Sequence, residues 1–121
     1  MKKFLFAILI VGLMFFLLGC TNPSSPSAYD DFAKCLSAKG ATMYGAFWCP
    51  HCKDQKASFG NSWQYVKYIE CSTPDGKNQL DVCKDANIQG YPTWVFADGS
   101  RLEGQVSMQE LSLKTSCPLP Q

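Results

Sequence analysis

Hydrophobic and polar positions from residue 29 onwards follow the periods of helices and strands in turn. Phe32, Ala33 and Leu36 share one face of a helix expected over 29–39, which Gly40 ends. The largely apolar run 42–47 predicts a buried strand. The same reasoning predicts further helices at 50–59, 78–86 and 107–115 and further strands at 66–71, 93–96 and 101–106. This order predicts an α/β domain with a mixed four-stranded sheet flanked by helices.

Turn and capping signals separate these segments. Residues 73–76 (Thr-Pro-Asp-Gly) predict a turn, and Asp98-Gly99 predicts a tight hairpin turn. Ser107 is followed three residues later by Glu110, which predicts a capping box for the last helix. Strand–helix–strand followed by an antiparallel hairpin and a helix matches the thioredoxin fold.

The N-terminus has the layout of a secretory signal. Lys2 and Lys3 precede the apolar and glycine run 4–18, and Gly19 and Cys20 follow. A membrane-spanning helix needs roughly 20 apolar residues, so this run favours a cleaved signal over the alternative of an uncleaved anchor helix.

The stretch 17–20 (Leu-Leu-Gly-Cys) resembles a bacterial lipobox. The resemblance implies cleavage before Cys20 and lipid modification of that cysteine, whereas ordinary secretory cleavage nearby would leave an unmodified thiol or remove it. Residues 21–28 are rich in Pro and Ser and suit a flexible tether. We therefore expect a lipoprotein-type signal peptide at 1–19, a lipid-anchored linker at 20–28 and a domain at 29–121. The expected location is the periplasmic or extracellular face of a membrane.

The charge and the cysteine content of the chain limit the kinds of function that it can have. Without residues 1–19, nine basic and ten acidic residues remain, and no basic patch indicates a nucleic-acid partner. Six of the seven cysteines follow Cys20. In an exported chain, this density predicts disulfide formation in an oxidising compartment.

The strongest chemical signal is Cys49-Pro50-His51-Cys52, placed where a predicted strand gives way to a predicted helix. At that junction Cys49 faces the unpaired N–H groups of the first helical turn, where Pro50 also fits. His51 adds positive potential, so both features favour the reactive thiolate. We expect Cys49 to be the more exposed, nucleophilic thiol and Cys52 to be the resolving thiol.

Other interpretations of this motif have less support. A zinc site needs four ligands, but His51 is the only histidine and no second Cys-x-x-Cys occurs. An inert disulfide between Cys49 and Cys52 is a further alternative, and His51 could be a plain surface residue or a general base. We expect no metal and no cofactor.

Residues 90–93 (Gly-Tyr-Pro-Thr) precede the predicted hairpin. In the thioredoxin fold a proline at this point is cis and lies against the two thiols, so we predict a cis bond at Pro92 rather than a plain turn. Tyr91 would then offer its backbone to an extended substrate. Trp48 is expected at the rim of the site, with a core position as the alternative.

Several separated stretches carry a family resemblance. They are, in chain order, 44–52, 68–71, 83–88 and 90–94. Together they resemble the thioredoxin-like domain fused to vitamin K epoxide reductase homologues in bacteria and plants, over residues 29–113. The resemblance implies a thiol oxidoreductase that takes electrons from exported cysteine-containing proteins and passes them to a membrane-embedded, quinone-linked reductase.

The chain departs from this family and from ordinary thioredoxins. It has no multi-helix membrane part, so we expect the electron acceptor to be a separate protein. Met43 stands where thioredoxins usually carry a buried acid. Proton exchange at Cys52 must then use water or another group.

Four further cysteines are expected to be structural. Cys71 ends a predicted strand and Cys83 lies in the next helix, and the resembling family also carries such a pair. Their disulfide would stabilise the fold by roughly 3 kcal/mol. Cys35 and Cys117 are then paired by elimination, although a second redox relay or a link to a partner is an open alternative.

The sequence thus predicts a membrane-tethered thiol–disulfide oxidoreductase, most simply an oxidase or exchange catalyst for exported proteins. A reductase and an isomerase are alternatives within that class. A non-catalytic lipoprotein for metal binding or assembly, built on the same fold, is the alternative from another class.

Overall fold

The computed structural model describes residues 27–121. The expected signal peptide at 1–19, Cys20 and most of the linker lie outside the described residues. The elements are, in chain order, α2 (Asp30–Ala38), β1 (Thr42–Gly45), α3 (Pro50–Phe59), η2 (Gly60–Tyr65), β2 (Lys67–Glu70), α4 (Asp81–Asp85), β3 (Thr93–Val95), β4 (Arg101–Glu103) and α5 (Met108–Thr115).

The four strands form one mixed sheet in the order β2-β1-β3-β4. β1 runs parallel to β2 and antiparallel to β3, and β3 pairs antiparallel with β4. In this register Met43 lies beside Tyr68 on one side and Trp94 on the other. The sheet topology therefore confirms the fold class predicted from the order of elements.

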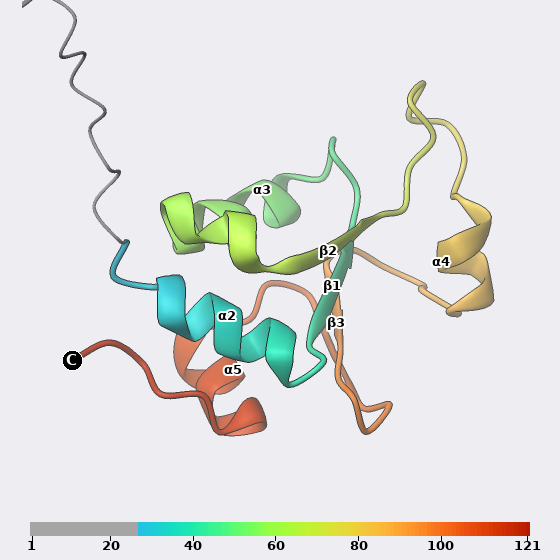
Figure 1. The fold of residues 1–121 in the computed structure, drawn as a ribbon. Helices are drawn as coiled ribbons and strands as arrows, with labels where there is room; N and C mark the ends of the chain where they lie inside the picture. The colour runs from blue at the N-terminus through green and yellow to red at the C-terminus, as the bar shows by residue number, and fades with distance from the viewer. Residues whose placement is uncertain (1–26) are drawn as a thin grey trace, which may run out of the picture.

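Helices cover the two faces of the sheet unequally. Figure 1 shows α2, α3 and α5 on one side of the strands and α4 on the other. The larger core joins Phe32 of α2, Phe59 of α3, Met43, Trp94 and Leu111 of α5. The smaller core holds Cys71, Cys83 and Ile88, against which Tyr44, Ile69 and Val95 pack from the strands. Alternating strand residues thus serve two separate cores.

All four strands are shorter than the sequence predicted, most of all β4, which ends at Glu103 rather than 106. Two helical segments differ as well. α4 begins at Asp81 rather than 78, because Ser72 forms an antiparallel bridge with Gln79 and the Leu80 N–H donates to the Cys71 carbonyl. The sequence predicted no element between residues 59 and 66, but the 3-10 helix η2 lies there and packs against α2 and α3. Neither difference alters the sheet.

Two disulfides cross-link the part of the chain that the structure describes. Cys71 is bonded to Cys83 and Cys35 of α2 is bonded to Cys117, which follows α5. These are the two pairs expected from the sequence. The second closes a loop of 82 residues, for which chain entropy gives about 4.5 kcal/mol of stabilisation.

Within residues 27–121, no helix is both long enough and apolar enough to cross a membrane.

Candidate active site

The start of α3 fixes the position of the first thiol. Cys49 is the N-cap residue in an extended conformation, and its N–H donates to the Ala46 carbonyl at 3.0 Å. Pro50 occupies the first helical turn, where a backbone N–H has no intrahelical partner. The thiol of Cys49 therefore lies at the positive end of the helix dipole, which favours negative charge.

The two thiols differ in accessibility. Cys49 is 5% exposed and Cys52 is 0% exposed, and both are free thiols. Cys49 is the more accessible, as predicted, but it is buried, whereas the sequence led us to expect an exposed residue. Its Sγ lies 3.7 Å from the Tyr91 carbonyl, to which the thiol donates. An incoming sulfur can therefore reach Cys49 only at the small part of this residue that is exposed.

Close packing around Cys52 requires a glycine in β1. A Cβ atom at Gly45 would lie 2.9 Å from the Cys52 Sγ and 3.0 Å from Cε2 of Tyr68. Burial raises the pKa of the Cys52 thiol to about 12, and the thiol of Cys49 adds to this effect. The backbone of Ala46 and the charge of Lys56 act in the opposite direction. Cys52 is therefore protonated at neutral pH.

Tyr68 and Lys56 lie near Cys52, and Glu70 is bonded to Tyr68. Met43 is fully buried and brings no charge to this position. Its strand neighbour Tyr68 donates its hydroxyl to Glu70 at 2.7 Å, and Lys56 Nζ lies 3.8 Å from the Tyr68 ring centroid. Burial and then the Glu70 carboxylate raise the pKa of Tyr68 above its ordinary value. These groups replace the buried acid as the polar surroundings of the resolving thiol.

Pro92 directly follows Tyr91, whose carbonyl accepts from the Cys49 thiol. The Tyr91–Pro92 peptide bond is cis, as predicted, and Pro92 is fully buried. Trp48 is 47% exposed and its ring meets that of Tyr91 edge to face at 5.9 Å. Trp48 thus lies at the rim, as expected. His51 is exposed in the first turn of α3, so a role in tuning Cys49 stays a prediction.

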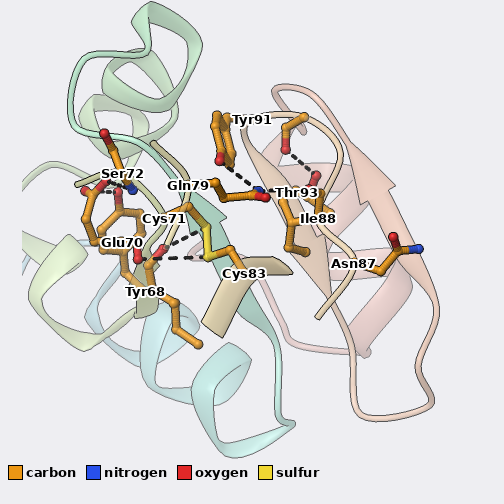
Figure 2. Close-up of a disulfide and its surroundings, with 12 residues drawn as sticks. Tyr68, Glu70, Cys71, Ser72, Gln79, Cys83, Asn87, Ile88, Tyr91 and Thr93 are labelled. Carbon is orange, nitrogen blue, oxygen red and sulfur yellow. Dashed lines mark hydrogen bonds between the residues drawn. A yellow bond between two sulfur atoms is a disulfide. The ribbon is translucent and has the colours of Figure 1, made fainter. Parts of the chain in front are cut away.

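Glu70 organises the loop before Cys49, a role that the sequence did not predict. Its Oε1 accepts from the backbone N–H groups of Phe47 at 3.2 Å and Ser72 at 2.9 Å, as Figure 2 shows in part. A carboxylate at the end of a strand gives no sequence signal for such a contact. Gly45 did carry a sequence signal, since a glycine inside a strand often marks a position where another part of the molecule approaches the backbone closely.

Within residues 27–121, no group of three or more His, Cys, Asp or Glu side chains is arranged to hold a metal ion. The thiol pair, the cis-proline and the helix N-terminus instead form an arrangement suited to exchange between a thiol and a disulfide.

Comparison with known proteins agrees with this geometry. Residues 27–115 match the thioredoxin family. The thiol-disulfide oxidoreductase LTO1 of Arabidopsis thaliana is 40% identical over an alignment of 116 residues, and this alignment covers 92% of this chain and 30% of LTO1. The chain therefore spans less than a third of the length of this relative.

Proposed function

The chain belongs to the thioredoxin family, and we propose that it is a protein thiol–disulfide oxidoreductase that exchanges disulfides with exported proteins through Cys49 and Cys52. The position of Cys49 supports this most directly. It caps α3 with its thiol against the Tyr91 carbonyl, while Cys52 lies one turn further into the same helix. The name of the Arabidopsis relative states the same activity for that protein.

In the oxidising direction, a substrate thiolate attacks Sγ of Cys49 in the Cys49–Cys52 disulfide. A mixed disulfide forms, the internal bond breaks, and Cys52 leaves with the electron pair and takes a proton from water. A second substrate thiolate then attacks the substrate sulfur, and Cys49 leaves as a thiolate. The substrate has lost two electrons to the protein, which is left as the dithiol present in this structure.

The unequal burial of the two thiols suits these roles. Cys52 is inaccessible to substrates but lies next to Cys49, so it can displace only what Cys49 has captured. Its raised pKa keeps it protonated while a mixed disulfide forms. The oxidising direction is further supported by the position of Cys49 at the N-terminus of α3, with Pro50 in the first turn, because the helix dipole there stabilises negative charge and hence the dithiol form.

The location and partners belong to the same proposal. A lipid on Cys20 would hold the domain at the outer face of a membrane, and residues 21–28 would tether it. A membrane-embedded thiol oxidoreductase of the vitamin K epoxide reductase kind, or a functional equivalent, would reoxidise the dithiol and pass two electrons to a quinone. The signal-like sequence at 1–20 and the family resemblance support these assignments.

Replacement of Cys52 by serine tests the exchange step. Cys52→Ser removes the resolving thiol, so we expect mixed disulfides between Cys49 and exported proteins to accumulate in cells. Non-reducing electrophoresis after acid quenching and thiol alkylation detects them. The matched control, Cys49→Ser with Cys52→Ser, should give none. Absence of adducts in Cys52→Ser, or equal adducts in the control, contradicts the mechanism.

A further inference from the structure

A hairpin outside the Cys-x-x-Cys motif holds both aromatic side chains that flank Cys49. Trp48 Nε1 donates to Ser72 Oγ at 2.9 Å. Gln79 Nε2 donates to the Tyr91 hydroxyl, also at 2.9 Å, and Figure 2 shows this bond beside the Cys71–Cys83 disulfide. Because the Trp48 and Tyr91 rings also contact each other, both rings are fixed from two sides.

The residues that make these bonds lie opposite each other on a closed hairpin, residues 71–80. Ser72 and Gln79 are partners in an antiparallel bridge. The Thr73 N–H donates to the Asn78 carbonyl at 2.9 Å, and the Leu80 N–H donates to the Cys71 carbonyl at 2.7 Å. The disulfide from Cys71 then joins the base of the hairpin to α4. The hairpin is thus held in shape independently of the aromatic side chains.

The hairpin also shapes the surface beside the nucleophile. A Cβ atom placed on Gly76 would lie 3.5 Å from Trp48 Cδ1 and 3.9 Å from Phe47 Cζ. Phe47 and Trp48 are each 47% exposed, so two large apolar rings are accessible to a partner beside Cys49. The Glu70 carboxylate, which bonds the Phe47 N–H, also accepts from the Ser72 N–H and the Tyr68 hydroxyl. On the side of Cys49 that faces the hairpin, the exposed surface is therefore formed by the apolar rings of Phe47 and Trp48.

We propose that Ser72 and Gln79 are positioning residues for the substrate site. They hold Trp48 and Tyr91 as a fixed aromatic wall beside Cys49, and this wall accepts an apolar side chain next to the reacting cysteine of an extended polypeptide. The inference rests on the proposed function and adds to it a substrate preference and the residues that set it.

The test compares oxidation of three thiols by the disulfide form of the full chain. The probes are a peptide with leucine next to its cysteine, the same peptide with aspartate there, and dithiothreitol. We expect the wild type to prefer the leucine peptide. Ser72→Ala with Gln79→Ala should lower the rate constant for that peptide by about tenfold, as expected for loss of the two hydrogen bonds that hold Trp48 and Tyr91. The rate with dithiothreitol and the glutathione midpoint should stay unchanged.

Two further variants show whether the hydrogen bonds are responsible. Tyr91→Phe keeps the ring and the bond from Gln79 Nε2 to the Ile88 carbonyl but removes the hydroxyl, so a slower reaction of this variant with the leucine peptide can be assigned to the Gln79–Tyr91 bond alone. Gln89→Ala removes the same side chain from an exposed position where it bonds only Asn87, and it should behave as wild type. Circular dichroism and the unfolding midpoint show whether each variant is folded.

The outcomes separate the two proposals. A wild type that exchanges with none of the three thiols overturns the proposed function. A wild type that exchanges with all three but does not prefer the leucine peptide overturns this inference alone. The inference is also overturned if the variants of Ser72, Gln79 and Tyr91 react like Gln89→Ala. It is overturned as well if they slow the reaction with dithiothreitol as much as the reaction with the leucine peptide.

Discussion

Cys49 and Cys52 share one turn of α3 but have opposite surroundings. Cys49 lies at the helix N-terminus with a narrow access to solvent, whereas Cys52 packs against Gly45 and Tyr68 with no exposure. One thiol can therefore meet a substrate and the other can meet only its neighbour. This asymmetry gives the pair a fixed order of reaction.

The raised pKa of Cys52 predicts a pH-dependent stability of the reduced protein. In the unfolded chain the thiol ionises near its ordinary pKa of 9.0, but in the folded protein it keeps its proton up to about 12. Unfolding in this range releases a proton, so the free energy of unfolding falls as pH rises from about 9 to about 12. The stabilisation is fully present below this range. Denaturant unfolding of the reduced protein at several pH values measures it.

Cys52→Ser provides the control, since serine does not titrate there. All other residues are the same in both proteins, so the difference between the two pH profiles reports on Cys52. Identical profiles for reduced wild type and Cys52→Ser would contradict the protonated, buried state of this thiol.

At the scale of elements, a buried glutamine holds α3 in place. Gln55 is fully buried, and its Oε1 accepts from the Val106 N–H at 2.7 Å and from Trp94 Nε1 at 3.4 Å. Its Nε2 donates to the Val106 carbonyl at 3.1 Å. The side chain thus satisfies the backbone of the segment before α5 and joins it to the helix that carries both thiols.

Replacement of Gln55 by leucine should therefore destabilise the fold. The Val106 N–H and carbonyl would stay buried without partners, and we expect a loss of about 2 to 4 kcal/mol in the free energy of unfolding. Chemical denaturation measures it. Gln64→Leu, at an exposed position in η2, should change stability by about 0.5 kcal/mol or less. Equal effects of the two substitutions would contradict the bridging role of Gln55.

Local signals account for the elements that the sequence predicted well. α3 has the predicted bounds because Pro50 fits its first turn and Gly60 follows with a positive φ. The capping of α5 was also local, since Ser107 accepts from the Glu110 N–H. By contrast, the start of α4 depends on the bridge between Ser72 and Gln79, which joins positions seven residues apart.

The residues of the candidate site likewise divide into those with a local sequence signal and those without one. The two thiols and Pro92 were found because spacing and turn chemistry are visible in the sequence. Glu70, Gln55 and Gln79 were missed because their partners lie far along the chain or are backbone groups. Polar side chains of this kind carry no periodic pattern, so only the folded chain shows what they hold.

For the whole molecule, we propose that a redox domain with two structural disulfides is held at a membrane by a lipid on Cys20. Cys20→Ala tests the anchor. We expect the unchanged protein in the membrane fraction, released by detergent, and the Cys20→Ala protein in the soluble fraction of the envelope. Cys49→Ser should fractionate like the unchanged protein. A Cys20→Ala protein that stays in the membrane would instead support an uncleaved anchor helix.

The central claim is that Cys49 and Cys52 form a reversible redox pair. Equilibration of the purified protein in glutathione buffers, followed by alkylation and mass mapping, tests it most directly. We predict one two-electron transition confined to these two cysteines, with a midpoint more positive than the value of about −270 mV for thioredoxin. A midpoint at or below that value would contradict the oxidising direction. Thiols that do not interconvert with a disulfide across the series would contradict the account itself.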